Sequence, residues 1–524
     1  MTPSLSAIAA AASAGAPAET LTLFDQLPAA QVVLPLLGAV VITVVRAERP
    51  SFWIALAVAW ATPVIAILLL HEALTGGTIS YGLGGWEPPF GIEYRVDALS
   101  GFMLVLVSIM GALVLSFAPR SVAAEIPKRL RGWYYAMMLT CFAGLLGMAI
   151  SGDAFNIFVF MEISSLATYV MIALGRDRRA LVAAFQYLVI GTLGATFYVI
   201  GAGLLFTVTG TLNLVDMAAT LGEDATRAPA QAALAFIAVG IGLKLALFPL
   251  HLWLPNAYAF APSTATAFLA STATKVAVYI LCRFLFLVYG VDVVLTDRDA
   301  LTFALILAVI AMVAPSLVAI FQANVKRMLA YSSVAQIGYI ILGVALLNES
   351  GLTGGISHLF NHAIIKGCLF LAIGSVVYAT GITKIDEMAG LGRTMPWTMA
   401  AFVIAGLGLI GVPGTAGFVS KWYLIQGATE AGQWWLVGAI VFASILAVFY
   451  VGRVIQVAWF RPPEGASFDP KDTPWEMFAV TWALALLTLY FGLQTDLSAG
   501  VPAFAAEALL AGPASLIEGA AGAE

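Results

Sequence analysis

Ionisable side chains interrupt the most apolar stretches of this chain. Lys244 lies in QAALAFIAVGIGLKLALFPLHLW, Lys275 in FLASTATKVAVYILCRFLFLV and Glu162 in AFNIFVFMEISSLATYVMIAL. A charge at bilayer depth costs at least about 2.5 kcal/mol, so such residues are rare in membrane segments unless they have a function. Their presence on separate segments indicates a route for protons or ions through a membrane.

A second group of titratable residues lies on one apolar segment, ISHLFNHAIIKGCLFLAIGS. His358, His362 and Lys366 recur at every fourth residue, which places them on one face of a helix. Burial and a neighbouring carboxylate act in opposite directions on a lysine, and histidine titrates near neutral pH. A row of such groups, bridged by hydroxyls and water, is suited to a proton relay.

Two further titratable residues lie close to prolines within apolar segments. His251 follows Pro249, and Lys421 follows the Pro413–Gly414 pair. Proline breaks a helix, and broken helices at membrane depth are tolerated where they line a cavity or pack within protein. We therefore predict relay roles for both residues.

Each of these positions also has a plainer interpretation. Lys421 can extend its side chain to the headgroups, His251 can bind backbone carbonyls at the broken helix, and a structural role fits His358 as well as a relay role does. The pair Lys326–Arg327 is typical of a cytoplasmic loop, and Asp153 is expected to cap a helix, with cation binding as a weaker alternative.

The composition requires a membrane environment for the elements that carry these residues. Of the 524 residues, 61% are hydrophobic and only 10% charged, against about 25% charged in soluble proteins. The net charge of −5 gives nucleic acid no attractive surface. The three cysteines lack metal-ligand or iron–sulfur spacing, and no phosphate-binding loop is present, so we expect no cofactor and no metal.

Windows of about 20 apolar residues predict an all-α polytopic protein with about fourteen transmembrane helices. The predicted spans are 31–46, 52–70, 98–118, 133–151, 154–174, 181–207, 231–250, 263–289, 301–322, 329–347, 354–379, 398–426, 434–459 and 475–494.

The chain ends flank these spans as short segments. Residues 1–30 lack the basic start of a signal peptide and are expected to form an N-terminal surface segment. The Ala-, Gly- and Pro-rich residues 495–524 are expected to form a tail. Most loop lysines and arginines follow odd-numbered spans, whereas Arg95, Arg227 and Arg298 follow even-numbered ones. The positive-inside rule then places both termini outside the cytoplasm.

Six collinear segments carry a resemblance to a known family. Together they resemble the antiporter-like subunits that respiratory complex I shares with Mrp-type multisubunit sodium/proton antiporters. Within that family the chain looks most like the D-type subunits of Mrp antiporters, although FPLHLWLPNAY is closer to the complex I style. The segments are GDAFNIFVFMEISSLATYVMIALG, GLKLALFPLHLWLPNAYAFAPS, TKVAVYILCRF, NVKRMLAYSSVAQIGYIILG, HLFNHAIIKGCLFLAIGS and GLIGVPGTAGFVSKWYLI.

The resemblance implies a fold with two inverted five-helix repeats, formed by helices 4–8 and 9–13, in which helices 7 and 12 are broken. The chain then divides into an N-terminal segment (1–30), helices 1–3 (31–132), the first repeat (133–289), the second repeat (301–459), the last helix (475–494) and the tail (495–524).

The resemblance also implies roles for the relay residues. Glu162 and Lys244 would form a coupling pair on the proton uptake side, and Lys275 would be the central relay. The relay would then continue through His358, His362 and Lys366, with Lys421 as its terminal site.

The implied function is proton translocation in a multisubunit cation/proton antiporter, with Na⁺ as the expected cation and other membrane subunits as partners. A bacterial inner membrane is the expected location. The alternative is a proton-pumping subunit of complex I or a related redox-driven complex, which would be a translocase rather than a secondary transporter. A scaffold subunit, in which the buried polar residues only hold helices together, is the third hypothesis.

Overall fold

The computed structural model describes residues 24–296, 298–462 and 473–512, and within them the chain is almost entirely helical. Thirteen helices among these residues are long and apolar enough to cross a membrane. They correspond to thirteen of the fourteen predicted spans. The other predicted span, 398–426, is divided into two shorter helices. The predicted class, an all-α polytopic membrane protein with a broken twelfth span, is therefore confirmed.

Most predicted spans are single helices. They are α2 (Leu27–Val45), α3 (Glu48–Thr75), α4 (Ala98–Glu125), α5 (Arg131–Ile150), α6 (Ala154–Ala173), α7 (Arg179–Thr209), α9 (Ala228–Leu245), α14 (Arg298–Ile320), α15 (Val325–Ala345), α16 (Glu349–Thr380), α20 (Trp434–Ile455) and α21 (Trp475–Leu493).

Shorter elements complete the bundle. They are β1 (Ile79–Gly82) and β2 (Glu93–Val96), which form an antiparallel hairpin, and the helices α8 (Leu214–Leu221), α10 (Leu254–Phe260), α11 (Ser263–Ser271), α12 (Ala273–Cys282), α13 (Val291–Thr296), α17 (Leu391–Thr394), α18 (Pro396–Ile410), α19 (Ala416–Glu430) and α22 (Val501–Leu510). Three π-helical turns are η4 (Arg283–Val288), η6 (Gln456–Phe460) and η7 (Asp496–Gly500).

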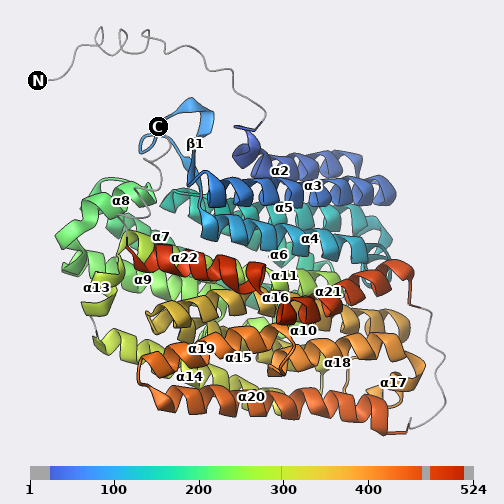
Figure 1. Cartoon of the computed structure of the whole chain (residues 1–524). Coiled ribbons are helices and arrows are strands. Elements are labelled where there is room, and N and C mark those ends of the chain that lie inside the picture. The colour runs from blue at the N-terminus through green and yellow to red at the C-terminus, as the bar shows by residue number, and fades with distance from the viewer. Residues whose placement is uncertain (1–23, 297, 463–472, 513–524) are drawn as a thin grey trace, which may run out of the picture.

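The long helices lie side by side, and α16 runs through the centre of the bundle (Figure 1). It packs against α4, α11, α15, α18, α19 and α21, and nearly all of its residues are buried. The outer helices instead expose large apolar side chains, such as Val44, Phe185 and Phe449. An apolar outer surface is what contact with lipid requires, and the polar residues of α16 are kept away from it.

Two isolated β-bridges relate the halves of the molecule. Asp153, just before α6, pairs with Asn213, just after α7, and Asn324, just before α15, pairs with Lys384, which follows α16. Each bridge is closed by two backbone hydrogen bonds of 2.8 and 2.9 Å. Five spans separate Asp153 from Asn324, so the two bridges lie at opposite ends of the bundle. The same local arrangement at opposite ends is what inverted repeats require.

Two predicted segments differ from the observed ones. The eighth span, predicted as continuous over 263–289, is interrupted at Thr272, whose φ of −126° and ψ of −57° are not helical. It then ends in the π-helical turn η4. The predicted tail also contains η7 and α22; α22 packs on α16 and α4, and its residues Ala505, Ala506 and Leu509 are buried. Residues 1–23 and 513–524 of the two predicted end segments lie outside the described residues.

Candidate functional site

The first helix break holds Lys244 beside a carboxylate. Helix α9 ends at Leu245, where Ala246 adopts the left-handed conformation (φ 59°), and α10 begins only at Leu254. Lys244 occupies the last turn of α9 and is 8% exposed. Cations are favoured at this end of a helix because unpaired carbonyls gather there.

Helix α6 supplies the partners of Lys244. The Lys244 Nζ lies 3.5 Å from Glu162 Oε1 and donates a hydrogen bond of 2.5 Å to Ser165 Oγ. Glu162 and Ser165 are three residues apart and therefore share a helix face. The Glu162 side chain is 24% exposed, whereas that of Lys244 is 7% exposed. The structure thus brings together the carboxylate and the lysine that the sequence singled out.

His251 lies in the irregular turn between α9 and α10. Its ring stacks on Phe248 at 5.2 Å between centroids and meets the edge of Tyr331 at 6.2 Å. Among the described residues no hydrogen bond joins it to Glu162 or Lys244. The structure therefore places His251 near the first break in an aromatic environment rather than in the Glu162–Lys244 pair.

Lys275 lies just after the break that the sequence analysis did not predict. Its Nζ donates hydrogen bonds to the carbonyl oxygen of Ala270, before the break, and to Thr274 Oγ1 at 3.4 Å. The side chain is 1% exposed. The interruption at Thr272 leaves a carbonyl available near the centre of the protein, and Lys275 uses it. Helix α12 packs against both α9 and α16, so Lys275 is on the helix between the two other groups.

The three residues predicted to share one face of α16 do so and are at most 2% exposed. His358 bonds Ser420 Oγ at 2.8 Å through Nδ1 and Gln336 Oε1 at 2.9 Å through Nε2. Its ring stacks on that of His362 at 5.9 Å. Lys366 donates to the Leu329 carbonyl at 2.8 Å and to Ser332 Oγ at 2.5 Å.

Helix α15 provides the neutral partners that sequence reasoning missed. Ser332, Gln336 and Tyr339 lie at intervals of four and three residues, so they form one polar face opposite α16. That spacing was visible in NVKRMLAYSSVAQIGYIILG and was the available signal. Lys326, interpreted from sequence as an ordinary cytoplasmic loop residue, is instead 4% exposed and donates to the Ala261 carbonyl at 2.6 Å.

The second helix break holds Lys421 among neutral acceptors. Helix α18 ends at Ile410, and Gly411 adopts the left-handed conformation (φ 91°). The Lys421 Nζ donates to the carbonyls of Leu409 and Ile410 at 3.1 and 2.9 Å and to Ser444 Oγ at 3.0 Å. Because the amine points into the break, extension toward the headgroups is not its role here.

Lys421 also lies at the wall of a surface cavity. Its Nζ is 4.6 Å from the centre of the Tyr339 ring. Lys421 and Ser444 line an otherwise apolar cavity of about 240 Å³ between α19 and α20, together with Trp422 and Ile445. The second break is thus close to the side of the bundle, as the partly exposed Glu162 is at the first.

The site residues form three groups, and within the third the order differs from the one that the resemblance implied: His358, bonded to Ser420, lies nearest the break that holds Lys421, whereas Lys366 bonds Leu329 and Ser332. Lys244 and Glu162 form the first, Lys275 the second, and the α16 residues with Lys421 the third. Among the described residues no direct hydrogen bond joins one group to the next. The residues that the structure describes also contain no cluster of three His, Cys, Asp or Glu side chains that could hold a metal ion.

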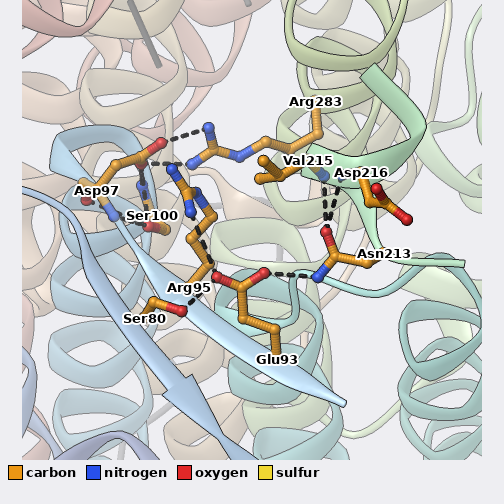
Figure 2. Close-up of polar contacts among 9 residues, drawn as sticks. All are labelled: Ser80, Glu93, Arg95, Asp97, Ser100, Asn213, Val215, Asp216 and Arg283. Atoms are coloured by element: carbon orange, nitrogen blue, oxygen red, sulfur yellow. Dashed lines mark hydrogen bonds and ion pairs between the residues drawn. The ribbon is translucent and has the colours of Figure 1, made fainter. Parts of the chain in front are cut away.

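A separate network of buried charges at one end of the bundle was not predicted (Figure 2). Arg283 and Asp97 form a two-pronged ion pair, and Glu93 accepts from Arg95 and Asn213. Burial alone would raise the pKa of Asp97, but the charge and hydrogen bonds of Arg283 outweigh it and lower that pKa to about 2. The carboxylate of Asp97 is therefore ionised at all physiological pH values.

The expected cap at Asp153 is confirmed. Its carboxylate accepts from the Asn156 backbone N–H at 2.6 Å at the start of α6. Burial raises the pKa of Asp153 despite this bond.

Comparison with known proteins agrees with this fold. Residues 151–447 match the family described as "NADH:quinone oxidoreductase/Mrp antiporter, TM". The chain is 41% identical to the N-type subunit of the NADH-quinone oxidoreductase of Desulforudis audaxviator over 454 residues, or 86% of this chain and 90% of that protein. It is 31% identical to the D-type subunit of the Na⁺/H⁺ antiporter of Alkalihalophilus pseudofirmus over 434 residues, or 83% and 86%.

A solved structure extends the likeness to nearly the whole chain. One protein of the Mrp complex from a Dietzia species superposes with a TM-score of 0.87 and 27% identity, over 95% of this chain and 99% of that one. The chain belongs to the NADH:quinone oxidoreductase/Mrp antiporter family of membrane subunits. The predicted likeness to the D-type subunits of Mrp antiporters is confirmed, and the protein is a multi-pass, antiporter-like transporter subunit.

Proposed function

We propose that this chain is the proton-translocating subunit of a multisubunit cation/proton antiporter in a bacterial inner membrane. The observation that carries the proposal is the contact between Glu162 and Lys244 at the first helix break. The proton affinity of a carboxylate beside a buried ammonium changes when its partner changes charge or position, which couples the two groups.

Protons would pass along the plane of the membrane, through one group after another. Lys244 would exchange with Lys275, and Lys275 with the face of α16 that carries His362 and Lys366. His358 and Ser420 would then lead to Lys421 at the second break. His251 lies beside the first break and would admit or position protons there. The two halves, 133–289 and 301–459, would each contribute one terminal lysine.

Other membrane subunits would complete the transport path. Glu162 and Lys421 each lie toward a side of the bundle rather than at its ends, so neighbouring helices can reach both. The antiporter relatives are subunits of multisubunit complexes by their names. Na⁺ is the proposed exchanged cation, by analogy with those names. The distribution of loop lysines and arginines supports termini outside the cytoplasm.

The similarity to an oxidoreductase subunit favours a second candidate, a proton-pumping subunit of a redox-driven complex. Purification of the native complex separates the two functions. Partners that are small membrane subunits without iron–sulfur or flavin groups would support the antiporter. Cysteine-rich soluble partners that carry such groups would support the redox-driven complex.

The test of the proposal is exchange in membrane vesicles that contain the assembled complex. Glu162→Gln and Lys244→Ala are each expected to abolish Na⁺-dependent proton flux, while a native gel shows an intact complex. Normal flux in both assembled variants would refute the proposal and favour a scaffold role. Comparison of Na⁺, K⁺ and Li⁺ in the wild-type complex identifies the cation.

A further inference from the structure

Arg283 lies on the same helix face as Lys275 and separates it from one end of the bundle. Lys275, Tyr279 and Arg283 follow one another at intervals of four residues, so these three positions form a row on one helix face, with the Lys275 amine bonded to the carbonyl of Ala270. Arg283 Nε donates to the Tyr279 hydroxyl at 2.9 Å, and its guanidinium lies 4.8 Å from the centre of that ring. The row therefore runs from the central lysine of the proposed relay toward the hairpin end of the bundle.

Asp97 holds Arg283 at the end of this row (Figure 2). The guanidinium donates to Asp97 Oδ2 at 2.6 Å and to Oδ1 at 2.5 Å. Asp97 is itself fixed at the start of α4, where Oδ1 accepts from the backbone N–H of Ser100 at 2.9 Å and from its hydroxyl at 3.0 Å. Both partners are largely buried, with side chains 5% and 15% exposed. The Arg283–Asp97 ion pair is therefore held in a fixed position at the hairpin end of the row, and we call it the closure of the row.

A second network supports the closure from the side of the β-hairpin. Glu93 accepts from Ser80 at 2.7 Å, from Arg95 at 3.3 Å and from Asn213 at 2.6 Å. The Asn213 side chain also caps α8. Strands β1 and β2, helix α8 and the start of α4 are therefore tied together around the ion pair, which leaves Arg283 little freedom to move.

The chemistry of arginine decides what this arrangement does. A guanidinium has five N–H donors, no acceptor, and no deprotonated form in proteins. A proton that reached the Tyr279 hydroxyl could therefore not continue through Arg283 to Asp97. Lysine or histidine at the same position could accept and release a proton and would extend the relay to the hairpin end.

We propose that Arg283 insulates the relay: it prevents protons from leaving Lys275 toward the hairpin end, so that Lys275 exchanges only with the sites on α9 and α16. This inference rests on the proposed relay through Lys275. It adds a function for a residue that carries no proton itself, because exchange with a cation is coupled only if no shorter proton path exists.

The experiment measures passive proton conductance in vesicles that contain the whole complex, with a K⁺ diffusion potential set by valinomycin and no Na⁺ present. Arg283→His is expected to raise the conductance about tenfold, because imidazole exchanges protons near neutral pH and guanidinium does not. The double variant Arg283→His with Lys275→Ala should return to the wild-type conductance, because its proton path is interrupted.

Arg131→His is the matched control. Arg131 forms another interhelical ion pair, with Glu48 at 2.7 Å, and lies on no row that leads to Lys275. The proton conductance of the Arg131→His complex should equal that of wild type. If Arg283→His does not assemble, Arg283→Lys keeps the charge beside Asp97, can release its proton, and is also expected to leak.

Two results would overturn the inference. One is an assembled Arg283→His or Arg283→Lys complex that is as tight as wild type. The other is a leak that persists in the double variant with Lys275→Ala, since that would indicate loosened packing. Failure of the proposed function would look different: it would appear as normal Na⁺-dependent flux in the Glu162 and Lys244 variants, whatever the conductance at Arg283.

Discussion

The two helix breaks have the same backbone conformation but stabilise their lysines differently. Each first half-helix ends in a left-handed residue, Ala246 after α9 and Gly411 after α18. At the first break a carboxylate from another helix lies 3.5 Å from Lys244. At the second, among the described residues, Lys421 bonds only neutral oxygens, two of them carbonyls at the break itself.

The difference shows two ways to keep an ammonium in an apolar bundle. A counter-ion neutralises the charge, and its effect changes when the carboxylate is protonated. Carbonyl dipoles exposed by a break also stabilise the charge, but their effect changes only when the backbone moves. We therefore expect the first break to respond to protonation and the second to conformation.

The largest expected effect comes from removal of the counter-ion. Glu162→Ala leaves Lys244 buried with Ser165 as its remaining partner, which should cost about 3–5 kcal/mol if the ammonium stays charged. The measurement is the thermal stability of the purified complex. Glu430→Ala, which removes an exposed carboxylate of α19 bonded to Ser350, should change it little. Equal stability of wild type and Glu162→Ala would remove the distinction between the breaks.

The ion pair of Asp97 with Arg283 lies outside both breaks and gives a second measure of what the loss of a counter-ion costs. Because the pKa of Asp97 is lowered to about 2, its pairing stabilises the fold fully above about pH 4 and progressively less down to about pH 2. The pH-dependent part of the cost of Asp97→Asn should therefore be about 2 kcal/mol at neutral pH and much less at pH 2–3. The measurement is the stability of wild type and Asp97→Asn to unfolding, compared from neutral pH down to about pH 2. If the stability lost in Asp97→Asn is as large at about pH 2–3 as at neutral pH, the lowered pKa of Asp97 is contradicted.

A smaller effect is expected from one neutral partner at the second break. Ser444→Ala removes one of the three acceptors of Lys421 and should cost about 1–2 kcal/mol, with slower exchange rather than none. Ser444→Thr should restore most of the rate. Ser316→Ala is the control, because that buried hydroxyl bonds, among the residues that the structure describes, only the Met312 carbonyl of its own helix. Complete loss of exchange in Ser444→Ala would mean that the acceptors at this break do not act independently.

Effects of similar or smaller size, and of opposite sign, are expected at the two residues in the left-handed conformation. Gly411→Ala should destabilise by about 1–2 kcal/mol, because a side chain disfavours this conformation. The added Cβ would also lie 2.9 Å from Lys421 Cδ. Ala246→Gly should stabilise by about 1 kcal/mol or less, since strain is removed while chain entropy is added. Thermal melts of both variants show whether each one is more or less stable than wild type. A change in the same direction in both would argue that the two breaks do not use the left-handed residue in the same way.

The sequence predicted most of this arrangement because its signals were local. Apolar windows placed the spans, prolines marked both breaks, and the interval of four residues placed His358, His362 and Lys366 on one face. The break at Thr272 has no proline or glycine to mark it. Lys275 bonds the carbonyl of Ala270 across the break.

The contacts between distant segments could not be predicted in the same way. Arg283 and Asp97 are separated by 186 residues, and neither has a neighbour in sequence that points to the other. Lys326 looked like a loop residue because it lies next to Arg327 at the start of a span. Only the packed structure shows that its amine turns inward to the carbonyl of Ala261.

The central claim is that the two breaks communicate through the buried face of α16. His362 lies between His358 and Lys366 on that face, is fully buried, and contacts neither terminal lysine by a hydrogen bond among the described residues. The direct test is Na⁺-dependent proton exchange by assembled His362→Leu complexes in vesicles, with the exposed His71→Leu as control. The account predicts that exchange is lost in the first and normal in the second. Wild-type exchange in His362→Leu would contradict it.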